Sequence, residues 1–193
     1  MARTSTVSAL PVYTVGHSTC TIPQFVELLR AGDVRVVVDV RRFPRSRSNP
    51  QFNEDALPAE LAPYQIRYRR IPELGGLRGK MPVPEEVNAF WENRSFHNYA
   101  DYALSEEFGA GFEQLLGLSS EERVAIMCAE AVWWRCHRRI IADYLIAAGR
   151  SVFHLMGDHD VKPATLTKTA IPELRGLSYP IQHSVREAPR SDR

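Results

Sequence analysis

The chain has 193 residues, of which 44% are hydrophobic and 24% charged, as in globular proteins, so a disordered or fibrous chain is excluded. The 24 basic and 23 acidic residues leave a formal net charge of +1, which excludes a strong overall attraction to nucleic acid or membranes. The three cysteines are too few for a disulfide framework, and no apolar run approaches the roughly 18 residues of a membrane span. We therefore expect a cytoplasmic protein that does not enter the membrane and that recognises any anion at a local site.

Strand-like and helix-like segments alternate from the start of the chain. A first strand is expected at Val12–Val15, and the helix after it is expected to begin beyond Thr21 and to end at Gly32. The nearly continuous valines of Val34–Val40 are typical of a parallel strand that is covered on both faces. A short helix is expected near Asn53–Leu61, within a stretch otherwise rich in arginine, proline and serine.

The same alternation continues in the second half of the chain. A third strand is expected at Ile66–Ile71, and residues 77–118 are expected to form a helical insertion. Its helices are predicted at Pro84–Glu92, His97–Leu104 and Glu106–Leu118. The predicted elements that follow are a fourth strand, a helix and a fifth strand, at Arg123–Cys128, Arg135–Gly149 and Ser151–Met156.

This order of elements predicts an α/β fold of three layers. The sheet is expected to be mainly parallel, of the Rossmann-like or flavodoxin-like kind, with the helical insertion between its third and fourth strands. We expect a single domain over residues 10–181, with flexible termini at 1–9 and 182–193. Ligands of such folds bind beyond the carboxyl ends of the strands, so the residues that follow each strand are the candidate site.

The segment CAEAVWWRCHR, from Cys128 to Arg138, is the richest candidate. A cysteine at a strand end before a helix start is the arrangement of cysteine phosphatases and rhodaneses, and the helix N-terminus would bind an anion. Six residues separate Cys128 from Arg135, however, where the phosphatase pattern has five, and no glycine lies between them. This departure argues against a phosphatase, and a buried structural cysteine is the alternative.

Glu130 is the candidate general base or nucleophile, with a structural ion pair to a neighbouring arginine as the alternative. Because it follows an apolar strand, its carboxylate is expected at the floor of a pocket and out of bulk water. His137 is expected to point towards Glu130 and, together with His17, to assist proton transfer. A structural histidine bonded to a backbone carbonyl is the alternative for His137.

Cys128, Cys136 and His137, together with His17, are also the available ligands for a metal ion. Their C-x7-C-H spacing lacks the C-x2-C pair of structural zinc sites, so we assign no metal and treat these ligands as the less favoured alternative. The sequence requires no cofactor. A thiol redox role for the two cysteines would need their Cα atoms to lie closer than ~7 Å.

Four arginines fall within the seven residues RRFPRSR at 41–47, directly after the second strand. Guanidinium groups bind phosphate or carboxylate in a forked geometry, so Arg41, Arg45 and Ser46 are expected to hold an anion. A solvated loop that pairs with acidic helices is the alternative. The further residues expected to bind the substrate or anion are Ser18, Arg138, Gly75 and Gly76.

Several short motifs of the chain resemble those of a known family. These are GHS at 16–18, DVR at 39–41, PRS at 44–46, NPQF at 49–52, LGG at 74–76, YADY at 99–102, CAE at 128–130 and CHR at 136–138. Over about residues 12–160 the chain resembles the domain-of-unknown-function 488 family of bacteria and archaea. The resemblance implies a small cytoplasmic α/β protein with a polar pocket, and it implies no established reaction.

The leading hypothesis is an enzyme that acts on a phosphate-bearing ligand: a nucleotide, a nucleoside or a nucleic-acid base. Cleavage or transfer at a glycosidic bond, or another hydrolysis, fits a carboxylate in an arginine-lined site. One alternative is a non-catalytic nucleic-acid-binding module, whose binding would depend steeply on salt. Another is a thiol redox protein that uses Cys128 and Cys136. The expected partner is an anionic small molecule or nucleotide, with nucleic acid as the alternative, and the sequence does not indicate an oligomeric state.

Overall fold

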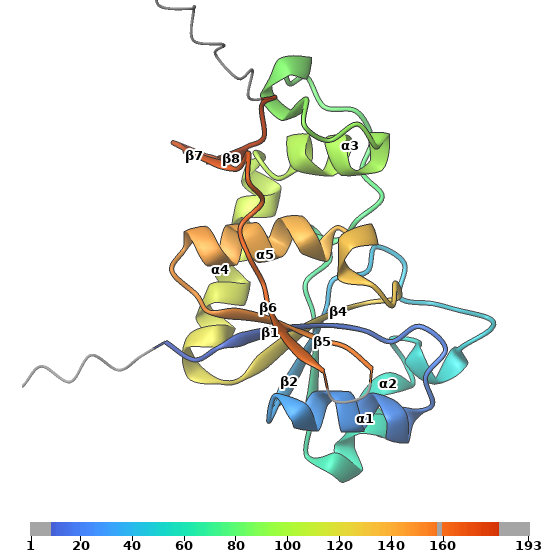
Figure 1. Ribbon diagram of the computed structural model, residues 1–193. Helices are drawn as coiled ribbons and strands as arrows, with labels where there is room; N and C mark the ends of the chain where they lie inside the picture. Colours follow the sequence, from blue (N-terminus) through green and yellow to red (C-terminus); the bar gives the residue numbers. More distant parts are fainter. Residues whose placement is uncertain (1–8, 158–159, 182–193) are drawn as a thin grey trace, which may run out of the picture.

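The computed structural model describes residues 9–157 and 160–181, and it is built around a six-stranded sheet (Figure 1). The strands lie in the order β3-β2-β4-β1-β5-β6. Their bounds are Val12–Gly16 (β1), Val36–Asp39 (β2), Arg67–Arg70 (β3), Val124–Cys128 (β4), Val152–Leu155 (β5) and Val161–Pro163 (β6). The first five strands pair in parallel, and β6 pairs antiparallel with β5. The predicted α/β fold with a mainly parallel sheet is confirmed.

Helices cover both faces of this sheet (Figure 1). On one face lie α1 and α2, spanning Ile22–Ala31 and Leu57–Leu61. On the other lie α4 (Glu106–Glu121) and α5 (Arg138–Ala147), with α3 (Arg94–Tyr102) packed beyond them. Short 3-10 turns complete the connections, at Pro50–Phe52 (η1), Ala62–Tyr64 (η2), Pro72–Leu74 (η3), Glu85–Asn88 (η4) and Trp133–Arg135 (η5).

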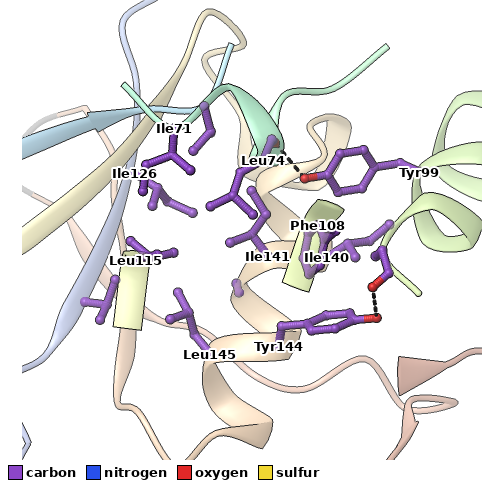
Figure 2. Close-up of a cluster of buried hydrophobic side chains, with 14 of the residues drawn as sticks. Ile71, Leu74, Tyr99, Phe108, Leu115, Ile126, Ile140, Ile141, Tyr144 and Leu145 are labelled. Atoms are coloured by element: carbon purple, nitrogen blue, oxygen red, sulfur yellow. Dashed lines mark hydrogen bonds between the residues drawn. The ribbon is translucent and has the colours of Figure 1, made fainter. Parts of the chain in front are cut away.

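The alternation of side chains along the strands explains the two hydrophobic cores. In β2, Val37 faces α1 and α2, whereas Val36 and Val38 face α4 and α5. Figure 2 shows the second core, in which side chains from α4 and α5 pack against β4 and the residues around η3. Two tyrosines at its border satisfy their hydroxyls on backbone carbonyls, Tyr99 on Leu74 at 2.7 Å and Tyr144 on Ala103 at 3.0 Å.

Local signals fix the first helix where the sequence predicts it. The Thr21 side chain accepts a hydrogen bond from the backbone N–H of Gln24, and the Gln24 side chain accepts one from the backbone N–H of Thr21 at 2.9 Å. This reciprocal pair is a capping box, which satisfies two otherwise free donors at the helix start. The apolar residues Phe25, Val26 and Leu29 of α1 are buried against the sheet.

The second half of the chain differs from the prediction in several details. A separate helical insertion is not confirmed, because Phe108 and Leu115 of α4 pack in the core that covers the sheet. The helix predicted at Pro84–Glu92 is only the turn η4, and the helix predicted from Arg135 begins at Arg138. The predicted flexible termini, apart from residue 9, lie outside the described residues.

Three short strands were not predicted from the sequence. They are β6 and the separate antiparallel pair β7 (Ile171–Glu173) and β8 (Gly176–Ser178), each of three residues. A strand of this length shows too few alternations to be recognised. Within the part of the chain that the structure describes, every helix is too short or too polar to cross a membrane.

Candidate functional site

A pocket of about 370 Å³ opens beyond the carboxyl ends of β2 and β4. Four connections line it, after β2, after η3, at the start of α3 and between β4 and α5. Their lining residues are Arg41, Arg42, Phe43, Gly76, Leu77, Ser95, Phe96, Tyr99, Cys128, Ala129, Glu130, Arg135, Cys136 and His137. Five residues predicted to carry or bind substrate therefore meet in one pocket, namely Arg41, Gly76, Cys128, Glu130 and His137.

A first polar cluster, the arginine cluster of Asp39, Arg41 and His17, is buried beside the pocket, and of its three members Arg41 belongs to the pocket lining. Asp39 ends β2, and both of its carboxylate oxygens accept from Nε of Arg41, at 2.9 and 3.1 Å. A second Arg41 nitrogen donates to Asp39 at 2.5 Å and to the Phe52 carbonyl at 2.7 Å. The Tyr68 hydroxyl also donates to Asp39, at 2.8 Å. Most N–H donors of the Arg41 guanidinium are therefore bonded to protein groups, whereas an arginine that binds an anion needs free donors.

His17 completes the arginine cluster and does not line the pocket. Its Nε2 lies 3.1 Å from the remaining Arg41 nitrogen, and its Nδ1 lies 3.0 Å from the Ser18 carbonyl. Since guanidinium and carbonyl fix the donor and acceptor roles, the ring is neutral with its proton on Nδ1. Burial and the charge of Arg41 lower the pKa of His17 to about 4. The Phe52 ring stacks on it, with ring centroids 4.2 Å apart.

A second cluster, the thiol cluster of Cys128, Cys136 and His137, forms part of the pocket lining. Cys128 ends β4, Cys136 has an extended backbone between η5 and α5, and His137 directly precedes α5. Both cysteines are free thiols. The two sulfur atoms and a ring nitrogen of the histidine all lie within 4.8 Å of one another.

Three contacts fix the ring of His137. Its Nε2 donates to the Val40 carbonyl at 2.9 Å, so in the neutral ring Nδ1 holds the free lone pair, and this Nδ1 lies 3.6 Å from the Cys136 sulfur. The Tyr99 ring packs beside it with centroids 4.9 Å apart, and a Cβ added at Gly76 would come within 2.8 Å of Nδ1. The ring nitrogens are therefore directed at Val40 and Cys136. The expectation that this side chain points towards Glu130 is wrong, and the carbonyl-bonded alternative is what the structure contains.

Arg138 supports the thiol cluster from below. Its side chain is fully buried, its Nε donates to the Cys136 sulfur at 3.2 Å, and its terminal nitrogen donates to the backbone carbonyl of Glu130. Burial works to raise the pKa of Cys136, but the hydrogen bond with Cys128 and the neighbouring His137 and Arg138 outweigh it, so this pKa lies well below its usual value. The pKa of Cys128 is raised, first by that same hydrogen bond and then by burial. Arg138 contacts the sulfur and the loop, and does not line the pocket.

The Glu130 carboxylate is exposed, so its predicted place at the buried floor of the pocket is wrong. The burial of β4 ends at Cys128, and the next two residues face solvent at the pocket rim. The backbone carbonyl of Glu130 faces the sheet, and its carboxylate does not. The carbonyl lies against Gly16 at the end of β1, where an added Cβ would come within 1.9 Å of the carbonyl oxygen. Arg138 bonds that carbonyl, so the predicted alternative of a carboxylate–arginine ion pair is also not what forms.

The arginines that line the pocket differ in part from those that the sequence predicts as anion ligands. Arg42 and Arg135 are exposed on its lining, and among the described residues neither forms a salt bridge. Arg45 lies outside the lining and pairs with Asp55 at 3.6 Å. Ser46 also lies outside it, and its hydroxyl accepts from the backbone N–H of Asn49 at 3.1 Å.

Two further predicted residues shape the loops without lining the pocket. Ser18 has a left-handed backbone (φ 45°), and its N–H donates to the Ala129 carbonyl at 2.9 Å, which joins the ends of β1 and β4. Gly75 lies against the backbone of Pro72 and Arg42, where a Cβ would come within 2.9 Å of the Pro72 oxygen. Both residues therefore position the connections that carry the pocket residues.

Sequence reasoning missed Ser95 and Phe96, which line the pocket from α3. The predicted helix began at His97, but Asn93 caps the helix and its side chain accepts from the Ser95 N–H at 2.9 Å. Asparagine is a preferred N-cap residue, so this signal was present in the sequence.

The family model described as Domain of unknown function DUF488 matches residues 21–145. The chain belongs to this family. The DUF488 match runs from α1 into α5 and includes both the loop after β2 and the thiol cluster. Comparison with curated proteins and with solved structures gives no match.

The pocket of this DUF488 protein combines three kinds of chemical group. Two exposed guanidinium groups can bind phosphate or carboxylate. A solvated carboxylate, that of Glu130, can accept a proton. Two thiols and an imidazole nitrogen with a free lone pair can react as nucleophiles or bind a metal ion.

Proposed function

We propose that this protein is an enzyme that hydrolyses, or transfers a group from, a small phosphate-bearing ligand of the nucleotide or nucleoside kind. One observation carries the proposal: the exposed Arg42 and Arg135 line the same pocket as Glu130, and among the described residues they have no ion-pair partner. Free cations beside a free carboxylate suit an enzyme that must hold an anion and move a proton.

The anion-binding part of the proposal falls on Arg42 and Arg135. With a net charge of only +1, the chain offers no general attraction to anions, so binding must come from local groups. Arg41 lies behind them with its donors bound to Asp39 and Phe52, and it serves to hold the loop that presents Arg42.

The shape and lining of the pocket support a small ring-bearing ligand. Its volume of about 370 Å³ is at the lower end of the ~300–1,000 Å³ that small-molecule sites occupy. Phe43 and Leu77 are 68% and 74% exposed on its lining, and Phe96 adds a second aromatic ring. Aromatic faces stack on bases of any kind, so a nucleobase fits this wall.

Glu130 is the proposed general base. Its exposure leaves the carboxylate accessible to a water molecule or a substrate hydroxyl. A carboxylate in this position can also attack the anomeric carbon of a nucleoside. The new ester bond then replaces the glycosidic bond, the base leaves with a proton from water, and a second water molecule hydrolyses the ester. We propose the reduced cytoplasm as the compartment of this protein, since both pocket cysteines are free thiols.

The test begins with binding. Isothermal titration with adenosine monophosphate and with inorganic phosphate should detect binding to the wild-type chain, and replacing Arg42 and Arg135 together by alanine should weaken it about 100-fold. Arg35→Ala is the matched control, because Arg35 is an exposed arginine at the opposite end of β2 that pairs with Asp33. Equal affinities in the double variant and the wild type would remove the two arginines from the site.

Turnover tests the second half of the proposal. A screen of nucleotides, nucleosides and phosphate esters should find a substrate whose turnover Glu130→Gln abolishes without changing the melting temperature. Glu27→Gln is the control, since Glu27 is an exposed glutamate on α1 paired only with Arg30. Full activity of Glu130→Gln would exclude this carboxylate as the base.

A further inference from the structure

The thiol cluster brings together three ligands that the proposed function does not use. Two sulfur atoms and a ring nitrogen of His137 lie within 4.8 Å of one another, and Nδ1 is 3.6 Å from the Cys136 sulfur, although the sequence separates Cys128 from Cys136 by seven residues. The end of a parallel strand and the start of the following helix always lie near each other in this fold, so the spacing along the chain is no obstacle. We infer that Cys128, Cys136 and His137 form a binding site for Zn²⁺, with a fourth coordination position open to the pocket.

The histidine is already in the tautomer that a metal requires. Its Nε2–H donates to the Val40 carbonyl at 2.9 Å, which in the neutral ring leaves the lone pair on Nδ1, 3.6 Å from the Cys136 sulfur. Histidine ligands in metal sites commonly donate their other ring N–H to a carbonyl or carboxylate in this way. Gly76 packs against the same ring and has no side chain. A Cβ at this position would come within 2.8 Å of Nδ1, so glycine leaves the space beside this atom open.

The distances suit a tetrahedral ion. With Zn–S bonds of about 2.3 Å and Zn–N bonds of about 2.0 Å, neighbouring ligand atoms lie about 3.5–3.8 Å apart. The Cys136 sulfur and Nδ1 of His137 are 3.6 Å apart, and all three ligand atoms are within 4.8 Å. A movement of about 1 Å in one side chain closes the remaining gap.

The charges and the ligand types favour zinc over harder ions. Two thiolates and a neutral imidazole cancel the charge of Zn²⁺, so the bound ion adds no net charge beside the buried Arg138. Sulfur and imidazole ligands select zinc and other thiophilic ions over Mg²⁺ or Ca²⁺, which prefer oxygen. The N–H of Arg138 that donates to the Cys136 sulfur can remain in place when this sulfur binds the metal.

The pocket supplies the open position. All three ligands belong to its lining, and three protein ligands with a vacant place are typical of catalytic zinc sites, whereas structural sites have four. Zinc binding itself is independent of the proposed reaction. A role for the metal ion in activating water would rest on the proposed function, because the proposed base, the exposed Glu130, belongs to the same pocket lining.

The experiment measures zinc binding by the full chain in the absence of substrate. The reduced protein is stripped with a chelator and titrated with Zn²⁺ against a chromophoric competitor, and with Co²⁺ to detect thiolate-to-metal charge transfer. We expect one equivalent of Zn²⁺ and a cobalt spectrum of tetrahedral type with sulfur ligands. Cys128→Ser, Cys136→Ser and His137→Ala should each weaken binding by about 100-fold or more.

Cys20→Ser is the matched control, because Cys20 is a partly exposed thiol outside the cluster. It should bind zinc as the wild type does. Absence of a stoichiometric zinc site in the wild type, a cobalt spectrum without sulfur charge transfer, or equal loss in Cys20→Ser would overturn the inference. The cobalt spectrum of the wild type decides the matter even where a cysteine variant fails to fold.

Failure of this inference is distinguishable from failure of the proposed function. Phosphate binding to the chelator-treated wild type tests Arg42 and Arg135 without any metal. Phosphate binding without a zinc site would support the proposed function and reject the zinc site. A zinc site without phosphate binding would support the zinc site and reject the proposed function.

Discussion

Two polar clusters lie at the same pocket and differ in how completely their groups are bonded. In the arginine cluster, Asp39 accepts from four donor groups, three of Arg41 and the Tyr68 hydroxyl, and Arg41 is also bonded to Phe52 and His17. In the thiol cluster, the Nδ1 lone pair of His137 and both sulfurs keep binding capacity on the side of the pocket. The comparison teaches that buried charge by itself does not mark a binding group, because a fully bonded cluster holds the backbone and an incompletely bonded one can hold a ligand.

The largest expected effect is on stability, in the arginine cluster. Asp39→Ala leaves the buried guanidinium of Arg41 without its partner, so the free energy of unfolding should fall by about 3–5 kcal/mol. Urea denaturation followed by circular dichroism measures this change. Asp33→Asn is the control, since Asp33 is exposed, pairs with Arg35 and Arg123 at the surface, and has a left-handed backbone (φ 48°) that asparagine tolerates. Its loss should cost no more than about 1 kcal/mol. Similar costs for the two variants would contradict the contrast between buried and surface pairs.

The next effect is a dependence of stability on pH. The pKa of His17 is lowered to about 4, so between about pH 6.5 and pH 4 the unfolded chain binds a proton that the folded chain does not. Stability is therefore lost as the pH falls through this window, by roughly 3 kcal/mol for this histidine. His17→Gln should remove that share of the loss, as measured by urea denaturation at pH 7 and pH 4.5.

A second histidine serves as the comparison for this pH effect. Burial lowers the pKa of His154 to about 4 as well, and its Nδ1 lies 2.8 Å from the Thr14 hydroxyl. His154→Gln should flatten the pH dependence by a similar amount. A wild-type and a His17→Gln chain that lose the same stability on acidification would show that His17 does not remain neutral in the folded state.

The third prediction concerns the wall of the thiol cluster. Gly76→Ala places a Cβ within 2.8 Å of the His137 ring, which Val40 holds in place, so stability should fall by about 1–3 kcal/mol. Gly79→Ala is the matched control three residues further on, because no atom lies within 4 Å of its added Cβ. Thermal melting of both variants measures the difference. Equal melting temperatures would mean that the ring can move away.

The smallest expected effect separates the two kinds of arginine in the loop after β2. Arg42→Ala should weaken phosphate binding about tenfold, whereas Arg45→Ala should leave it within about twofold, because Arg45 lies outside the pocket and pairs with Asp55. Isothermal titration with inorganic phosphate measures both. A larger loss in Arg45→Ala than in Arg42→Ala would restore the anion site that the sequence suggested.

The fold could be predicted because its signals are local. The valines of β2, the capping box at Thr21 and the apolar stripe of α5 each specify an element without reference to the rest of the chain. The location of the site followed from the rule that strand ends meet at one edge, which brought Arg41, Cys128 and Glu130 into one pocket.

The directions of the site's side chains could not be predicted in the same way. The carboxylate of Glu130 is exposed because the backbone of its loop packs over Gly16, a contact between residues more than a hundred positions apart. Arg41 turns inward because Asp39, Tyr68 and Phe52 surround it, and these belong to three different elements. The closeness of Cys128, Cys136 and His137 could not be predicted from their spacing along the chain, because a strand end and a helix start bring them together.

The position of β1 has a practical consequence for experiments on fragments. This strand is the first in the chain, yet it lies inside the sheet and is hydrogen-bonded to both β4 and β5. A fragment cut at residue 21, where the family match begins, would lack β1 and would expose two unpaired strand edges. Such edges recruit other chains, so a fragment of this kind should aggregate when it is expressed. The boundary of any shortened chain is therefore set by the sheet, ahead of Val12.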